Sequence, residues 1–243
     1  GPLSLTNAGA STLAAGAINV DTTGNVATIN TPIISTVGLR STGAGTLELA
    51  GLNSIGGTIP MAGYVTANVL VTTPATATVS GVLRLVNGAT LPSTTVVALS
   101  YGTLDLGSNN VTLGGLVFNN PSLNEVTGTG TLRVNGEIHV LGDLSGAAGN
   151  VIYPNVDLGG GTQMVRVGVN TFFALQNACQ FRGTLSNGSL YKSYGLQNSG
   201  NQGNSDGMAL YGNNTYTGST TVNGNAVATG TNATTTLTVS GSG

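Results

Sequence analysis

One histidine and two nearby acids have the residue types and the spacing that chemistry would require. Glu137 and His139 are separated by one residue, and Asp143 follows soon after. Since alternate residues of a β-strand point to the same side, Glu137 and His139 would share one face, where they could bind a metal ion or transfer a proton. Two carboxylates and one imidazole fall short of the usual ligand sets. We therefore favour an outward-facing polar strip beside a turn, and we predict no metal site.

A second chemical motif is the segment from Gly203 to Gly207, which matches Gly-x-Ser-x-Gly. In hydrolases this turn exposes a serine nucleophile, and it requires a buried strand before the serine and a helix after it. Here Ser205 lies among Asn, Gly and Ser residues that indicate a polar loop, where such a match arises by chance. We predict no catalytic residue, no cofactor and no enzymatic activity.

Carbohydrate chemistry would require clustered carboxylates for cleavage or exposed aromatic rings for binding. The eight acidic residues are scattered along the chain, and tryptophan is absent. Most of the tyrosines are expected to flank turns, although together they could form a modest sugar-binding strip: Tyr64, Tyr101, Tyr153, Tyr191, Tyr194, Tyr211 and Tyr216. A carbohydrate-binding protein, or one that cleaves carbohydrate, therefore stays open as an alternative.

Charge is scarce in this chain. Only 6% of the residues are charged, against roughly a quarter in an ordinary soluble domain, and the net charge is −2. Six Lys and Arg residues leave no basic patch for phosphates, so nucleic acid is not expected as a partner. No apolar run approaches the ~20 residues of a membrane-spanning helix, so we expect no membrane insertion of this segment.

The elements that would position these side chains are strands with one repeated pattern. Gly-x-Leu-x-Leu begins at Gly45, Gly81 and Gly102, and again at Gly130 with valine in the last place. Each copy is a glycine turn followed by alternating apolar and polar residues, as expected for one buried and one exposed face. The recurrence of one strand pattern favours a stacked repeat over a β-sandwich. The residues predicted to point inward are Leu47, Leu49, Leu83, Leu85, Leu104, Leu106, Leu132 and Val134.

The middle residue of each copy lies between two inward residues and should point to solvent. These middle residues are Glu48, Arg84, Asp105 and Arg133, and their charges alternate in sign. If consecutive copies stack, the four side chains form an outer charge ladder in which each cross-strand pair contributes about 0.2–1 kcal/mol. We expect this ladder on one face of the stack.

The chain is predicted to be one continuous all-β body over residues 1–243, because helix signals are nearly absent. Clear repeat copies cover about 43–140 and 207–243, whereas the pattern is less regular at about 145–210. Gly, Asn, Asp and Ser separate the short strands and predict irregular loops between them.

One further repeat copy runs from Gly212 to Gly224 and reads Gly-Asn-Asn-Thr-Tyr-Thr-Gly-Ser-Thr-Thr-Val-Asn-Gly. This segment closely resembles the passenger-associated (autotransporter-associated) β-strand repeat of bacterial secreted and surface proteins, and the stretches 43–53 and 83–92 are similar to the same unit. The residues that carry the resemblance are Asn214, Thr215, Tyr216, Gly218, Thr220, Val222 and Asn223. The resemblance implies a right-handed parallel β-helix (β-solenoid). It also implies a segment that assists export and carries no fixed activity.

The leading expectation is a non-catalytic structural segment, such as a shaft, spacer or adhesin stalk, of an extracellular or cell-surface bacterial protein. The first alternative is a self-assembling subunit of an extracellular fibre, sheath or surface layer, since the strand edges at the ends of a solenoid can pair with another copy. The second alternative is a carbohydrate-binding β-helix. The expected partners are accordingly a second copy through the solenoid ends, or a host-surface or glycan ligand.

Overall fold

The computed structural model describes residues 3–5, 17–19, 25–29, 34–35, 39–42, 45–52, 54–55, 76–79, 82–119, 124–140, 149–167, 178–194, 207–222 and 237–239. Every regular element within these residues is a β-strand, which confirms the all-β class. The described part of the chain has no helix that is long and apolar enough to cross a membrane.

The strands form two long sheets and two short ones. Sheet I contains, in spatial order, β1 (Leu3–Leu5), β3 (Val26–Ile29), β6 (Thr46–Leu52), β9 (Val82–Thr90), β11 (Thr103–Asp105), β14 (Glu125–Thr127), β17 (Asn150–Ile152), β20 (Cys179–Phe181), β23 (Met208–Leu210) and β25 (Leu237–Val239). Sheet II contains β2 (Ala17–Asn19), β5 (Leu39–Thr42), β8 (Thr76–Val79), β10 (Val96–Leu99), β13 (Gly115–Phe118), β16 (Ile138–Val140), β19 (Thr162–Val167), β22 (Ser189–Tyr194) and β24 (Thr220–Val222). Sheet III contains β12 (Val111–Leu113), β15 (Thr131–Val134), β18 (Asn155–Asp157) and β21 (Leu185–Ser186), and sheet IV contains β4 (Ile34–Ser35) and β7 (Ser54–Ile55).

All strand pairs among the described residues are parallel. From β11 to β22 the chain visits sheets I, III and II in turn and then returns to sheet I beside the strand that it left. We call one such circuit a coil. Successive partners in sheet I stand 21, 22, 26, 29 and 29 residues apart, and they are Leu83, Leu104, Val126, Ile152, Phe181 and Leu210.

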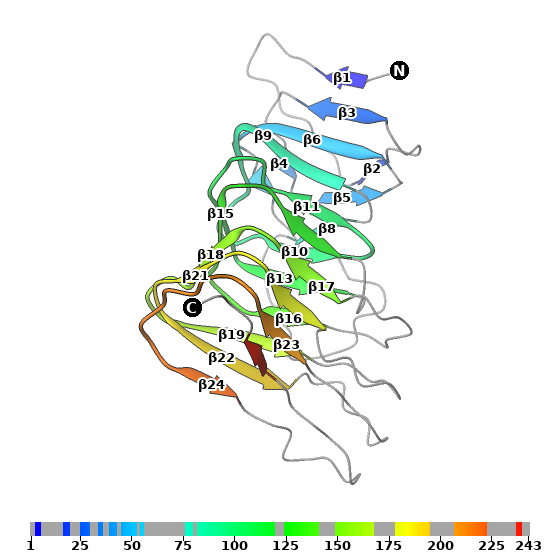
Figure 1. Ribbon diagram of the computed structural model, residues 1–243. Coiled ribbons are helices and arrows are strands. Elements are labelled where there is room, and N and C mark those ends of the chain that lie inside the picture. The colour runs from blue at the N-terminus through cyan, green and yellow to red at the C-terminus, as the bar shows by residue number, and fades with distance from the viewer. Residues whose placement is uncertain are drawn as a thin grey trace, which may run out of the picture.

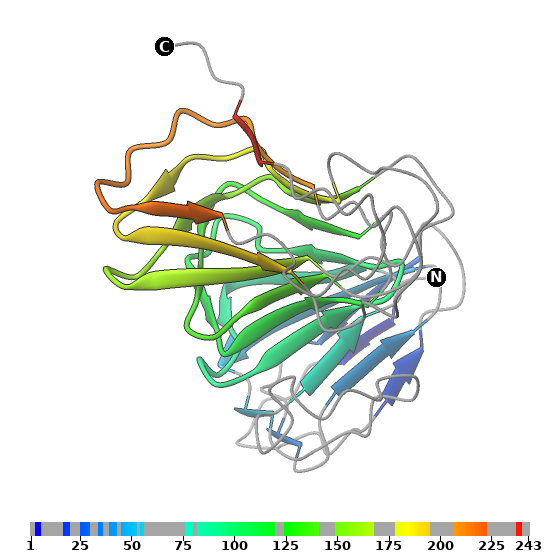
Figure 2. The ribbon, with the colours of Figure 1, turned by 90° about the horizontal axis from the view of Figure 1, so that it is seen from below.

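The coils are stacked along one direction. Figure 1 shows the strands of sheet I following one another from the blue N-terminal end to the orange and red C-terminal end. In the view from below, successive coils overlie one another around a common interior (Figure 2). Parallel many-stranded sheets that the chain visits in cyclic order are consistent with a parallel β-helix.

The common interior is apolar. In β3 and β15, and in the first four residues of β9, partly exposed and buried residues alternate, as expected for strands with one inward face. All eight residues predicted to point inward are buried, with at most 4% of their surface exposed: Leu47, Leu49, Leu83, Leu85, Leu104, Leu106, Leu132 and Val134. Leu47, Leu83 and Leu104 are register partners in sheet I, whereas Leu132 lies in sheet III between Val111 and Val156.

Sheet II is buried on both faces over its central strands. All residues of β10, β13 and β16 are buried, so the alternation seen in sheet I is absent. The run Val96 to Leu99 is continuously apolar, as parallel strands covered on both sides usually are. A side chain on the outer face of sheet II can therefore be as inaccessible to solvent as one in the interior.

Backbones of successive coils come very close at the corner that leads from sheet I to sheet III. A Cβ atom on Gly130 would collide with the backbone of Asn109, and one on Gly183 would collide with Pro154. Gly212 lies in the same way against Gly183 one coil later. At this corner glycine is required by the close approach of two backbones, since no side chain fits between them.

Candidate functional site

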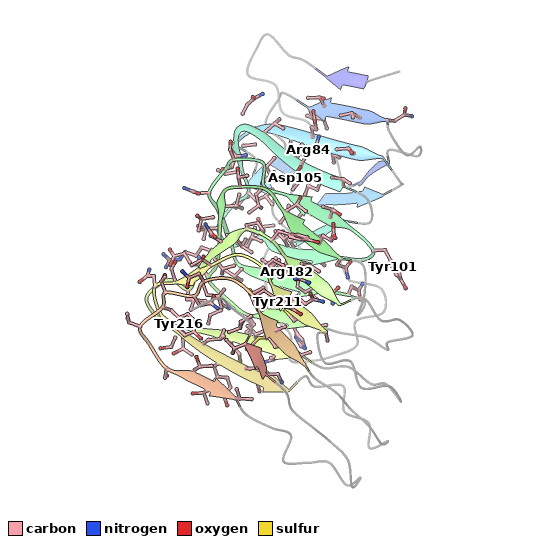
Figure 3. The ribbon with its side chains drawn as sticks, viewed as in Figure 1. Arg84, Tyr101, Asp105, Arg182, Tyr211 and Tyr216 are labelled. Carbon is pink, nitrogen blue, oxygen red and sulfur yellow. The ribbon has the colours of Figure 1, made fainter. Side chains whose placement is uncertain are left out.

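Three of the four charged residues predicted to form a ladder do stack on sheet I. Register pairs Glu48 with Arg84 and Arg84 with Asp105. The Arg84 guanidinium lies 3.1 Å from the Glu48 carboxylate and 2.7 Å from that of Asp105, and Thr28 donates a 2.9 Å hydrogen bond to Glu48. Figure 3 places Arg84 and Asp105 next to each other on neighbouring strands. The hydrogen bond to Asp105 is the main reason why the pKa of Arg84 is raised above its usual value.

Arg133 does not join this ladder, so the prediction of one four-membered ladder is wrong. Arg133 lies in sheet III, where its register partners are Thr112 and Asp157. Its guanidinium is 3.8 Å from the Asp157 carboxylate and donates a 3.5 Å hydrogen bond to the carbonyl of Gly159. The physical reason is that the Gly-Thr-Leu sequence begins strands at two different corners, one before sheet I at Gly102 and one before sheet III at Gly130.

Asp157 also closes the turn that follows its own strand. Its carboxylate accepts a 2.8 Å hydrogen bond from the N–H of Gly159 and another of 2.8 Å from the Asn187 side chain one coil later. The Gly159 bond is the main cause of a pKa of Asp157 below its usual range, with Asn187 and Arg133 acting in the same direction. Asp105 closes the turn after its own strand in sheet I in the same way, by accepting a hydrogen bond from the N–H of Gly107.

A third group of paired charges lies on sheet II. Glu137, just before β16, accepts two hydrogen bonds from the Arg166 guanidinium on β19, at 2.7 and 3.1 Å. Sheets I, II and III thus each carry charged side chains that pair between one coil and the next. These ion pairs connect neighbouring coils on the outside of the stack.

His139 is fully buried between the strands that carry Val117 and Arg166. The expected polar strip facing solvent is therefore wrong at this residue, because sheet II is covered on both faces. Neither ring nitrogen of His139 has a hydrogen-bond partner in the described part of the chain. Burial disfavours the imidazolium and lowers the pKa of His139 to about 4, with Glu137 raising it and Arg166 lowering it to smaller extents.

No metal site is assembled around this histidine in the described part of the chain. Glu137 is engaged by Arg166, and Asp143 lies outside the described residues. Over the described ranges there is no group of three His, Cys, Asp or Glu side chains that could hold a metal ion. The Gly-x-Ser-x-Gly match likewise lies outside the description except for Gly207.

Cys179 and Lys192 are both fully buried. Burial raises the pKa of the Cys179 thiol to about 12, and the charge of Lys192 opposes this to a smaller extent. Because the thiolate is the reactive form of cysteine, this thiol is held in its unreactive state.

Asparagine side chains join neighbouring coils through amide hydrogen bonds. The buried Asn124 accepts from the N–H of Gly102 at 3.0 Å and donates to the buried Asn150 at 2.8 Å. Asn110 and Asn155 accept from backbone N–H groups of the following coil, at 2.9 and 3.0 Å. These amides extend the hydrogen bonding along the stack through the corners, where the sheets are interrupted.

The segment that carries the family resemblance, residues 212–224, leads into β24 and includes it. Asn214 accepts a 2.9 Å hydrogen bond from the N–H of Leu185, and the Thr215 N–H donates to the Leu185 carbonyl, also at 2.9 Å. Tyr216 packs against the core, and its hydroxyl lies 2.6 Å from that of Thr220. The remaining residues of the pattern are Gly218, whose N–H donates to the carbonyl of Gly188, Val222, which is 41% exposed, and Asn223, which lies outside the described residues.

Sequence reasoning named Tyr153 and Tyr211 among seven candidate tyrosines for a sugar-binding strip, but it missed Arg182 and the exposed column that the three residues form on sheet I. Tyr153, Arg182 and Tyr211 each directly follow the register partners Ile152, Phe181 and Leu210. The Arg182 guanidinium lies 3.8 Å from the centre of the Tyr211 ring, and Figure 3 shows the two residues together. A signal was available, because the three residues recur at intervals of 29 positions.

The described geometry thus has three kinds of polar contact: ion pairs between coils, amide bonds at the corners, and one exposed column of tyrosine and arginine. The exposed column continues the outward column of the sheet I ladder, since Asp105 is in register with Thr127 and the pairing of Val126 with Ile152 places Tyr153 beside Thr127. No protein-family model, curated protein or solved structure matches this chain.

Proposed function

We propose that this chain is a structural, non-catalytic segment of a secreted or cell-surface bacterial protein, in which a right-handed parallel β-helix serves as a shaft or spacer. The observation that carries the proposal is the use of charged side chains. Among the described residues, three groups of ion pairs, one each on sheets I, II and III, connect one coil with the next and do not converge on one place. A scaffold needs such ties along its whole length, whereas an active site needs converging groups.

The β-helix itself is supported by the path of the chain. The cyclic order of sheets I, III and II returns each strand to a parallel neighbour one coil away. Connections between parallel strands of one sheet are right-handed in about 98% of cases, which supports the right-handed form. The inward leucines and valines then form one continuous interior along the axis.

The expected dimensions suit a spacer. Sheet I has ten strands, and nine spacings of roughly 4.8 Å give a stack of about 43 Å. Every coil contacts mainly its two neighbours, so length can be changed by adding or removing coils without redesigning the rest.

A location outside the bacterial cell is supported by the resemblance of residues 212–224 to export-associated repeats and by a surface that is poor in charge. An adhesin stalk or spacer would hold a binding domain away from the cell.

Self-assembly is the second candidate, and one observation favours it. Val222 on β24 and Val239 on β25 are 41% and 66% exposed, and these strands are the outermost described strands of sheets II and I at the C-terminal side. An uncapped parallel strand can pair with a further strand. That strand would come from a second copy in a fibre or from additional chain in a longer shaft.

Small-angle X-ray scattering of the purified chain, combined with electron microscopy, tests the shaft. We expect monomers with a stacked length of about 43 Å. Filaments that lengthen with protein concentration would favour the self-assembling subunit instead. A longest dimension well below about 43 Å would contradict both.

A further inference from the structure

The exposed column of Tyr153, Arg182 and Tyr211 forms a strip along the stack. Backbone hydrogen bonds continue the sheet I pairing through these residues, since the Arg182 N–H donates to Ile152 and the Tyr211 N–H donates to Phe181, both at 2.8 Å. Tyr153 is 47% exposed, Arg182 is also exposed, and Tyr211 is half-buried. The strip therefore presents one ring, one cation and a second ring in consecutive coils.

Arg182 differs from the other arginines whose side chains are described. Arg84, Arg133 and Arg166 each have a carboxylate within 4 Å, whereas Arg182 has no carboxylate partner in the described part of the chain. One of its terminal nitrogens donates a 2.8 Å hydrogen bond to Gln180, and Tyr211 supports it from one face. The guanidinium is thus held in place, and its other N–H groups have no carboxylate partner among the described residues, which suits the two-point recognition of a carboxylate.

The spacing of the rings indicates a stiff, extended ligand. Tyr153 and Tyr211 are two strand spacings apart, roughly 9.6 Å, which is close to the length of two linked sugar rings. The carboxylate of Glu125 lies in the neighbouring outward column, in register with Val151, so it is two coils away from Gln180 and does not neutralise Arg182. Aromatic faces next to an uncompensated cation match a sugar ring that carries a carboxylate.

We propose that this strip binds an acidic glycan, a polysaccharide of uronic acid units that lies along the axis of the stack. Tyr153 offers its ring face to one sugar, and Arg182 binds the carboxylate of the next. The Tyr211 ring keeps the guanidinium oriented. The site uses only the outer surface of the coils, so it goes beyond the proposed role as a shaft and does not depend on it.

Affinity electrophoresis of the purified chain in gels that contain polygalacturonate tests the strip. The matched neutral probe is the same polymer with its carboxylates methyl-esterified. We expect retardation by polygalacturonate, at least tenfold weaker retardation by the ester, and at least tenfold weaker binding of polygalacturonate by Arg182→Gln. Tyr153→Ala should weaken binding severalfold because the ring platform is lost.

Two variants serve as controls. Arg133→Gln removes one positive charge from sheet III, and Tyr101→Asn removes a tyrosine that is 67% exposed but lies away from the strip (Figure 3). Tyr101 has a φ of 56°, a conformation that asparagine tolerates well. Both controls should bind as the unchanged chain does, and circular dichroism should show all variants folded.

Equal losses in Arg182→Gln and Arg133→Gln would overturn the proposal, because binding would then follow net charge alone. Equal retardation by the methyl ester, or by polyaspartate at the same charge density, would also overturn it. Absence of retardation by polygalacturonate would do the same. None of these outcomes bears on the stacked length measured by scattering.

Discussion

At the scale of single residues, His139 gives the described part of the chain a specific sensitivity to acid. Its folded pKa is about 4, below the ordinary value of 6.5, so between these values the unfolded chain binds a proton that the folded chain does not. Stability is complete above pH 6.5 and falls by about 1.4 kcal/mol per pH unit as the pH decreases towards 4. Urea unfolding at pH 7 and pH 4.5 should therefore show a loss of about 2–3 kcal/mol from this residue.

The matched variant for this prediction is His139→Leu. It removes two buried ring nitrogens that lack partners in the described structure, so it should leave stability at pH 7 unchanged or improve it. The difference in unfolding free energy between the two proteins should then grow as the pH falls. A difference that is constant from pH 7 to pH 4.5 would show that the imidazole is not held neutral by burial.

The charge ladder on sheet I belongs to the same scale. A double-mutant cycle with Arg84→Gln and Asp105→Asn should give a coupling of about 0.5–1 kcal/mol, because the pair is short but partly exposed. Thermal unfolding of the four proteins of the cycle, in low salt and in 1 M NaCl, measures this coupling free energy. The coupling should shrink in high salt, where charges are screened within about 3 Å. A coupling that ignores salt would mean that packing, not charge, joins these side chains.

Single residues also show the limit of the sequence pattern. Leu47 and Leu104 could be placed inside from alternation alone, since alternate residues of a strand must share a face. The neighbours of Arg133 could not be predicted from alternation, because they depend on whether Gly130 begins a strand of sheet I or of sheet III. The burial of His139 could not be predicted either, since alternation assigns the side of a strand but not what covers that side.

At the scale of elements, the corner from sheet I to sheet III should tolerate no side chain. Gly130→Ala should destabilise the protein by more than about 2 kcal/mol, because its Cβ would collide with the backbone of Asn109. Gly161→Ala is the matched control, since nothing lies within 4 Å of its added Cβ and its backbone has no positive φ. Thermal unfolding of the two variants makes the comparison.

The control should stay within about 0.5 kcal/mol of the unchanged chain. If both alanine variants unfolded at the same temperature, the close approach of the two backbones at this corner would be refuted.

Elements also explain why the repeat looked imperfect in the sequence. The sheet I partners from Leu83 onward are separated by 21 to 29 residues, so no fixed period runs through the chain. Only the last coils keep one interval, and it places Tyr153, Arg182 and Tyr211 in one column. The continuously apolar strands of sheet II carry no alternation and so give no information about which residues face the interior.

At the scale of the whole molecule, coils should be removable as units. Deletion of residues 111–131 removes 21 residues and joins Asn110 to Leu132, the register partner of Val111. This variant should remain folded with a cooperative transition, because each strand regains a parallel neighbour. Deletion of 111–120 alone removes only part of a coil and should abolish that transition. Calorimetry shows whether each variant unfolds in a cooperative transition. If neither deletion variant shows such a transition, the coils are not equivalent units.

The central claim is that coils are stacked at a constant spacing along one axis, and distances between spin labels test it most directly. In a Cys179→Ala background, one label is attached at Gln180→Cys and the other at Thr103→Cys, Val82→Cys or Thr46→Cys. These positions share one outward column of sheet I, three, four and five strand spacings from Gln180. We expect distances near 14, 19 and 24 Å, which grow by roughly 4.8 Å for each added coil. Distances that fail to increase with the number of coils would contradict the stack.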